Sequence, residues 1–346
     1  MNRGVGRDLA VLPKAHLHLH LTGGMRPSTL LELAATQGRA LPAGLLDPHG
    51  ARVDVTVRRG WTRFQRLYDA AREVLTGPDE VRRVLAEIVQ DEAAAGSGWL
   101  ELQVDPSSYA ARLGGLQATV ELVLDALAEG TRATGVGTAL VLAANRTRHP
   151  GEAETLARVA RRFAGRGVVG FGLSNDETRG LMEDFAKAFR IARDAGLVAV
   201  PHAGELRGPR SVRAAVEDLR AARLGHGVRA VEDPVLLDLL AARGVVCEVC
   251  PASNVALGVL LSLSRVPVAR LRAAGVPVAL GADDPLLFRA GLLAQYDAAR
   301  TALGLSDAAL ADLAACSVRG STAPAAVQTR LLAGIDAWLA APAPSP

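Results

Sequence analysis

The sequence of 346 residues is poor in aromatic side chains, in cysteine and in lysine. Aromatic residues make up 3% of the chain, there are three cysteines, and the two lysines are Lys14 and Lys187. Three cysteines give no disulfide framework and suit a reducing compartment. The net charge is only +3, and the chain has no dense basic run. These features give little support for a nucleic-acid-binding surface.

The chain also lacks the long apolar runs of membrane proteins. No stretch approaches 18 uninterrupted apolar residues, so we expect no transmembrane helix. The first residues, MNRGVGRDLAVLPK, have no apolar core followed by a small-residue cleavage site, which argues against a signal peptide. We therefore expect a soluble, cytoplasmic protein with no membrane partner. The last residues, APAPSP, predict a short disordered tail at 341–346.

Eight short apolar runs alternate with longer segments in which apolar residues recur every three or four positions. Eight strands that alternate with helices predict the α/β class, and within it a (β/α)8 barrel (TIM barrel) rather than an open sheet. The predicted strands are 15–21, 99–104, 138–144, 168–173, 197–203, 222–227, 244–250 and 276–282. The predicted helices between them are 79–95, 116–134, 152–163, 178–195, 211–222, 233–243 and 266–274.

Two parts of the chain exceed this repeat. The connection over 25–97 is too long for one helix and predicts a helical insertion after the first strand. Residues 289–339 predict further helices at the carboxyl end. No linker rich in proline, glycine or serine divides the chain, so we expect a single domain over 1–340.

Polar side chains collect at the carboxyl ends of the predicted strands, where (β/α)8 barrels hold their reactive groups. They are His18, His20, His202, Glu205, His226, Asp283 and Asp284. Imidazole nitrogen and carboxylate oxygen are ligands that zinc prefers, and a catalytic zinc keeps one position open for water. The pattern predicts a metal-dependent hydrolytic site, in which Glu205 could move protons as a general acid and base.

The alternating run HLHLH raises the question of how many histidines share the metal. Strand geometry would place His16, His18 and His20 on one face. His18 and His20 lie nearest the end that opens into the site, so we expect these two to bind the metal. Because His16 lies about 7 Å deeper per two-residue step, we expect it to be a buried histidine that is hydrogen-bonded within the barrel.

Several segments resemble those of the adenosine deaminase family, in order and with similar separations: PKAHLHLHLTGG, VVGFGLSNDE, PHAGE, RLGHG, CEVCPASN and ALGADDPLLF. The resemblance spans roughly residues 12–335. It implies an α/β barrel that hydrolytically removes the 6-amino group of an adenine ring, with one Zn²⁺ or another divalent transition metal. It implies that His18, His20, His202 and Asp283 bind the metal. It also implies that Glu205 donates a proton to the purine, that His226 orients the water and that Asp284 contacts the purine.

Further candidates for substrate contact are Ser174, Asn175 and Gly204, which lie in the matching segments. Trp61 and Phe64 in GWTRFQRLYD could form an apolar lid over the site, although the packed face of a helix explains them equally well.

Three positions depart from the family's pattern. Thr22 stands where adenosine-specific members usually have an aspartate associated with the ribose 5′-hydroxyl, Asn175 where many have glycine, and Gln103 where an arginine is common. Because threonine is shorter and uncharged, Thr22 favours a 5′-modified adenosine such as aminodeoxyfutalosine, of menaquinone biosynthesis. Plain adenosine is the alternative, and free adenine stays open. The replacement of that arginine by Gln103 leads to no prediction about the substrate.

Such a substrate carries a carboxylate, which an arginine at the pocket mouth would suit through bidentate pairing. Arg26, Arg146 and Arg148 are the candidates. The sequence does not indicate an oligomeric state.

Three rival interpretations remain. A binuclear hydrolase of a related barrel would use a modified lysine after the fourth strand, but GLSNDE contains none, so one metal is favoured. The pair Cys247 and Cys250 in CEVC could bind zinc, yet its context differs from the P-C-x-x-C of cytidine-type deaminases, and a buried strand is favoured. A catalytically inactive protein that binds purine nucleosides is the alternative from another class, although every catalytic position is filled.

Overall fold

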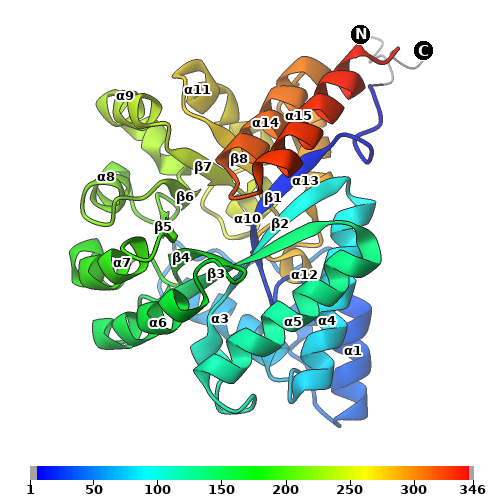
Figure 1. The fold of residues 1–346 in the computed structure, drawn as a ribbon, viewed down its shortest axis with the longest axis vertical. Coiled ribbons are helices and arrows are strands. Elements are labelled where there is room, and N and C mark those ends of the chain that lie inside the picture. Colours follow the sequence, from blue (N-terminus) through cyan, green and yellow to red (C-terminus); the bar gives the residue numbers. More distant parts are fainter. Residues whose placement is uncertain (1–5, 343–346) are drawn as a thin grey trace.

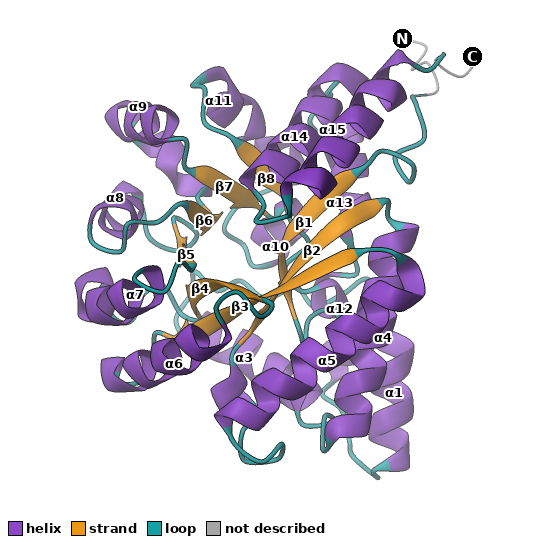
Figure 2. Cartoon of the chain, in the orientation of Figure 1, coloured by secondary structure: helices purple, strands orange, loops and turns teal. Residues whose placement is uncertain are grey.

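The computed structural model describes residues 6–342, and its centre is one parallel sheet of eight strands in the order of the sequence, β1 to β8. The strands are Lys14–His20 (β1), Ser97–Val104 (β2), Gly137–Asn145 (β3), Val168–Ser174 (β4), Val198–Ala203 (β5), Arg223–His226 (β6), Val246–Val249 (β7) and Val278–Leu280 (β8). A parallel bridge between Leu19 and Asp283 joins β1 to the segment after β8, so the barrel is nearly closed. Helices surround it (Figure 1, Figure 2). The predicted (β/α)8 barrel is confirmed.

The helices outside the barrel fall into three groups. The insertion after β1 contains Pro27–Thr36 (α1), Ala43–Leu46 (α2), Gly60–Arg72 (α3) and Pro78–Ala94 (α4). The later connections contain Leu116–Thr134 (α5), Pro150–Phe163 (α6), Ala186–Arg193 (α7), Pro209–Glu217 (α8), Pro234–Arg243 (α9), Pro251–Ala256 (α10) and Val268–Ala273 (α11). After β8 come Pro285–Phe288 (α12), Leu292–Thr301 (α13), Asp307–Gly320 (α14) and Ala325–Ala340 (α15). The extra helices predicted after the first strand and at the carboxyl end are therefore present.

One predicted helix begins later than expected. Instead of a helix from 178, a 3-10 helix at Met182–Phe185 leads into α7. Asp176 accepts hydrogen bonds from the N–H and the hydroxyl of Thr178, which form a turn. Gly180 then adopts a φ of 67°, a left-handed conformation that ends any helical run.

A β-bulge in β1 corrects the prediction that all three histidines share one face. His16 pairs with Leu100 of β2, whereas Leu19 pairs with Leu102. Between these two pairs β1 contains one residue more than β2, which is a β-bulge. The bulge puts His16 on the same face as Leu19, toward α4. There its Nδ1 lies 2.8 Å from Oε1 of Glu92, and its Nε2 accepts the N–H of Ala282 at 2.9 Å.

The ends of the described chain lie together on one side of the barrel. The guanidinium of Arg7 donates to the carbonyl of Ala341 at 3.1 and 2.6 Å. The last four residues of the tail predicted to be disordered, 343–346, lie outside the described residues. Within the described range, no helix combines the length and the apolar character needed to span a membrane.

Candidate active site

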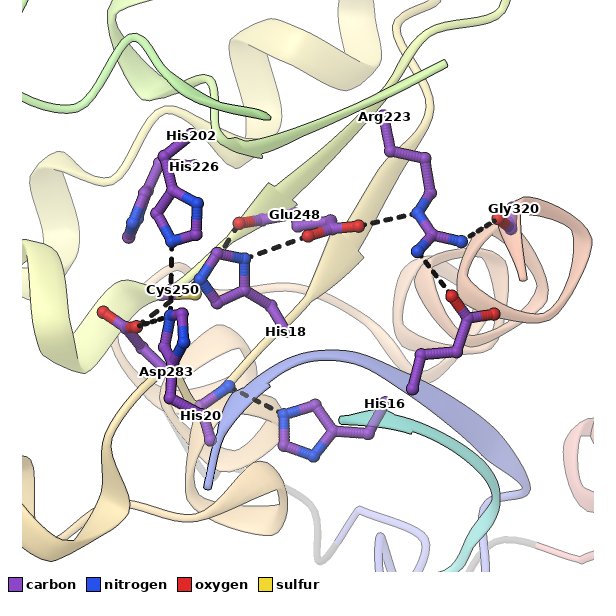
Figure 3. Close-up of polar contacts among 12 residues, drawn as sticks. His16, His18, His20, His202, Arg223, His226, Glu248, Cys250, Asp283 and Gly320 are labelled. Atoms are coloured by element: carbon purple, nitrogen blue, oxygen red, sulfur yellow. Dashed lines mark hydrogen bonds and ion pairs between the residues drawn. The ribbon is translucent and has the colours of Figure 1, made fainter. Parts of the chain in front are cut away.

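The four predicted metal ligands meet at the carboxyl end of the barrel (Figure 3). Nε2 of His20 lies 3.2 Å from Nε2 of His202 and 3.3 Å from Oδ1 of Asp283, and Nε2 of His18 lies 3.4 Å from the same oxygen. One ligand atom from each of the four falls within 4.8 Å of the others. A tetrahedral zinc ion with bonds of about 2.0–2.1 Å holds its ligand atoms roughly 3.3 Å apart. The spacing therefore fits a single divalent metal ion held by these four groups.

The imidazole of His18 is oriented from behind by Glu248 of β7. Nδ1 of His18 lies 2.9 Å from Oε2 of Glu248, while Nε2 faces the cluster without a hydrogen-bond partner among the described residues. Burial opposes protonation of His18, but the carboxylates of Asp283, 3.4 Å from Nε2, and of Glu248 outweigh it and raise the pKa of His18 to about 10. A metal ion that binds Nε2 must therefore displace a proton.

The backbone around these ligands is strained and closely packed. His226 and Asp283 have φ values of 68° and 61°, which side-chain-bearing residues seldom adopt outside sites where the fold enforces them. Gly225 lets His18 and His202 approach β6, because a Cβ there would lie 2.8 Å from Cε1 of His18 and 3.0 Å from Cγ of His202.

Glu205 and His226 face each other beside the ligand cluster. Nε2 of His226 lies 3.6 Å from Oε1 of Glu205, and the amide Nδ2 of Asn254 lies 3.2 Å from Nδ1 of His226. Burial lowers the pKa of His226 to about 3, so its imidazole is neutral. Since the Asn254 amide donates to Nδ1, the imidazole proton lies on Nε2. Burial, with the nearby charges of Asp283 and Glu177, raises the pKa of Glu205 well above its ordinary value.

Glu177, which sequence reasoning missed, fixes the loop that carries Glu205. Its carboxylate accepts hydrogen bonds from four successive backbone N–H groups, 204–207, and from the hydroxyl of Ser211, at distances of 2.6 to 2.9 Å. The available signal was its place in the segment LSNDE. Ser253 was missed in the same way, and its hydroxyl donates to Oδ2 of Asp283 at 2.6 Å.

A second group of potential ligands lies beside the first. His226, Cys250 and Asp283 also bring one ligand atom each within 4.8 Å. However, burial raises the pKa of the Cys250 thiol well above its ordinary value, and its Sγ lies 3.6 Å from the carbonyl of Glu248. Because the thiolate is the form that binds metals, this group is a poor second metal site.

The catalytic groups open into a cavity of about 80 Å³. Trp61, Phe64, Ser174 and Asn175 line it, as do Glu205, His226, Asp283 and Asp284. The carboxyl of Asp284 is buried, and its Oδ1 has no hydrogen-bond partner among the described residues. Burial and the neighbouring charge of Asp283 raise the pKa of Asp284 well above its ordinary value.

A wider polar hollow of about 410 Å³ adjoins this cavity. Both spaces are lined by Trp61, Gln65 and Asn175. Nε1 of Trp61 donates to Oδ1 of Asn175 at 3.0 Å, and Nδ2 of Asn175 donates to Oε1 of Gln65 at 3.0 Å. We call these three side chains the clasp, because they join α3 to the end of β4 between the two spaces.

Two residues expected to contact substrate do not line the cavity. Thr22 is buried, and its hydroxyl lies 2.6 Å from the hydroxyl of Tyr109, so its oxygen is already paired. Gly204 instead gives its N–H to Glu177.

The candidate arginines also differ in position. Arg26 lies outside both spaces and pairs with Asp91 on the exposed face of α4. Arg146 is buried and donates to the carbonyl of His202, which removes it from the pocket mouth. Arg148 does line the polar hollow. Its Nη1 lies 3.4 Å from Oε2 of Glu152.

A (β/α)8 barrel that carries three histidines and an aspartate at the carboxyl ends of its strands has the architecture of a metal-dependent hydrolase. Residues 13–338 match the family model described as adenosine deaminase. The chain belongs to the adenosine deaminase family.

Three relatives place the chain within this family. A "Putative adenosine/adenine deaminase" of Streptomyces virginiae is 59% identical, over 96% of this chain and 98% of its own length. The "Aminodeoxyfutalosine deaminase" of Streptomyces coelicolor is 36% identical, over 97% of this chain and 88% of its own length. The crystal structure of an adenine deaminase from Arthrobacter aurescens is 29% identical with a TM-score of 0.85, over 95% of this chain and 99% of that one.

Proposed function

We propose that this protein hydrolyses the exocyclic amine of a 6-aminopurine and uses one divalent metal ion, zinc by the chemistry of the ligands. The observation that carries the proposal is the cavity in which the ligand cluster, Glu205, His226 and Asp284 meet. Oε1 of Glu205 and Oδ1 of Asp284 are buried carboxyl oxygens beside the cluster with no hydrogen-bond partner among the described residues, and the protonated carboxyl groups could donate to the ring nitrogens of a purine. We further propose that the chain acts as a single-domain cytoplasmic enzyme.

The side chains suggest how the reaction proceeds. A metal bound by the four ligands would lower the pKa of water at the cluster toward neutrality. The Nε2–H of His226 holds that water opposite C6 of the purine. Glu205 gives its proton to N1 while the water oxygen bonds to C6, and Asp284 donates to N7. Glu205 then takes one proton from the added water and passes it to the amine. As the C6–N bond breaks and ammonia leaves, the second proton of the water returns to the Glu205 carboxylate and C6=O forms.

The size of the cavity favours free adenine as the substrate. One water molecule needs about 10–15 Å³ of cavity volume measured in this way. A cavity of about 80 Å³ therefore has room for a molecule of several heavy atoms, which is closer to the size of a purine base than to that of a nucleoside. The name adenine deaminase of the Arthrobacter relative agrees with this choice.

A nucleoside with an anionic 5′ extension is the second candidate. The polar hollow beyond the clasp supports it, since Arg66, Arg72, Arg148 and Arg179 outnumber Asp69 and Asp176 along its wall. Thr22, on which the preference for aminodeoxyfutalosine rested, gives it no support, because its hydroxyl is paired with Tyr109.

Release of ammonia from adenine, adenosine and aminodeoxyfutalosine, measured side by side, tests the proposal. We expect the highest kcat/KM with adenine, one metal ion per active chain by mass spectrometry, and loss of activity when a chelator removes that ion. Activity with none of the three compounds in the metal-loaded protein would refute deamination of 6-aminopurines. A preference for aminodeoxyfutalosine would instead establish the second candidate.

A further inference from the structure

Gln103, near the carboxyl end of β2, has a side chain that the fold leaves unpaired. The residue has no exposed surface, and neither Oε1 nor Nε2 of its amide has a hydrogen-bond partner among the described residues. Buried polar groups are almost always hydrogen-bonded. Because Gln103 lines the catalytic cavity, a molecule bound there can provide both missing partners.

The place of Gln103 in the barrel determines which part of a bound purine it faces. The metal ligands and the groups proposed to act on C6, N1 and N7 come from β1 and from the half of the barrel between β5 and β8. The remaining strands, β2 to β4, contribute Gln103, Asn145 and Ser174 to the cavity, and Gln103 pairs with the ligand His20 in the register of β1 and β2. With C6 at the ligand cluster, N1 at Glu205 after β5 and N7 at Asp284 after β8, the N3–N9 edge of the ring is left facing β2 to β4.

The N3–N9 edge of a free 6-aminopurine matches a carboxamide. N3 is a hydrogen-bond acceptor and the adjacent N9–H is a donor, whereas an amide offers one donor and one acceptor side by side. The contact proposed between Asp284 and N7 places the hydrogen of the five-membered ring on N9. A nucleoside lacks this hydrogen, because N9 bears the ribose.

We propose that Gln103 selects the free base, its Nε2 donating to N3 and its Oε1 accepting from N9–H. This inference rests on the proposed deamination of 6-aminopurines and adds the residue that distinguishes a base from its N9-substituted derivatives. A substrate without N9–H leaves Oε1 of Gln103 buried and unpaired, and such a site discriminates strongly against the substrate that lacks the partner group.

The test compares the wild type with Gln103→Leu on adenine, 9-methyladenine and 3-deazaadenine. In the wild type we expect kcat/KM for adenine to exceed that for each analogue by about tenfold or more, the effect of a lost partner for a buried polar group. In Gln103→Leu the value for adenine, which makes both bonds, falls by more than the values for the analogues, which make one bond each, so the preference collapses. The methyl group of 9-methyladenine meets a side chain of similar size in both proteins, so the change in preference reports the hydrogen bonds.

Two controls separate the possible failures. Gln117→Leu makes the same change on the exposed face of α5, where Gln117 donates to Glu121, and should preserve the preference. Gln103→Leu should also unfold at the same temperature as the wild type or higher, because an apolar group replaces an unpaired amide. Equal preferences in the wild type and Gln103→Leu would overturn the role of Gln103 while deamination stands. Absence of deamination in the wild type would overturn the proposed function itself.

Discussion

At the scale of single residues, the site depends on carboxylates that hold other side chains in place. Glu248 fixes the tautomer of His18 from one side and accepts from Nε of Arg223 at 2.7 Å on the other. Figure 3 shows these contacts, which run from His18 through Glu248 to Arg223 and away from the ligand cluster. A carboxylate behind a ligand histidine orients the ring and makes it a better ligand.

Glu248→Gln should therefore weaken metal binding by about 10- to 100-fold, the usual effect of losing such a partner. Competition with a chromophoric chelator measures this affinity independently of activity. Glu154→Gln provides the matched control, because Glu154 pairs with Arg158 and Lys187 on the surface and should leave the affinity unchanged. Equal affinities in all three proteins would show that Glu248 does not act through His18.

Glu205→Gln tests the proton donor. The amide keeps the size of the side chain but cannot release a proton to N1, so kcat should fall by about 10²- to 10⁴-fold, the range for general acid–base catalysis. Metal content should stay at the wild-type level, because Glu205 is not among the four ligands. Near-normal turnover with the metal bound would contradict the assignment.

At the scale of elements, the sequence predicts the strands well because buried parallel strands are continuous apolar runs. All eight predicted runs coincide with strands, and His18, His20, His202 and Asp283 converge because each lies at a strand end. The bulge in β1 leaves no comparable signal, since it arises from pairing with β2, and the histidine alternation looks unbroken in the sequence.

The contacts that the sequence did not reveal join residues distant along the chain. Glu177 binds the backbone at 204–207, some 30 residues away, and the clasp joins residues more than 100 positions apart. Periodicity and spacing report only local structure, so such partners emerge only once the barrel is folded. The same reason explains why Thr22, adjacent to the ligand strand, was expected to face the substrate.

The clasp makes a prediction about α3. Asn175 has a φ of 79°, so Asn175→Gly relieves backbone strain while it removes both side-chain hydrogen bonds to α3. The cavity should then open toward the polar hollow, and kcat/KM for adenosine relative to adenine should rise by roughly two- to tenfold, the worth of about one hydrogen bond.

Trp61→Phe removes the donor to Asn175 and should shift the same ratio in the same direction. Trp338→Phe makes an identical change in α15, where Nε1 of Trp338 donates to the carbonyl of Asp8, and should leave the ratio unaltered. An unchanged ratio in both clasp variants would show that α3 does not limit the size of the substrate.

At the scale of the whole molecule, a buried arginine ties the barrel together below the active site. Arg223 of β6 donates to Glu101 of β2, to Glu248 of β7 and to the carbonyl of Gly320 at the end of α14. Glu101 also accepts from the N–H and the hydroxyl of Thr322 at 2.6 and 2.9 Å. Because Arg223 and its partners lie in four separate parts of the chain, the network forms only when the barrel closes.

This network predicts how stability depends on pH. Burial of Glu101 opposes its ionisation, but the charge and hydrogen bonds of Arg223 outweigh burial and hold the pKa of Glu101 below its ordinary value. Between the folded pKa and the unfolded value of about 4.3, the unfolded chain binds more protons. The contribution of Glu101 is therefore complete above the unfolded pKa and is lost as the pH falls through the folded pKa.

Glu101→Gln should accordingly lower the free energy of unfolding near pH 7 by about 3–5 kcal/mol, the cost of breaking a buried ion pair. Denaturant unfolding from pH 7 to pH 3 should show this difference from the wild type shrinking below about pH 4.3. Glu129→Gln removes an exposed partner of Arg82 and should show almost no difference at any pH. A difference for Glu101→Gln that stayed constant with pH would mean that its packing, rather than its charge, supports the barrel.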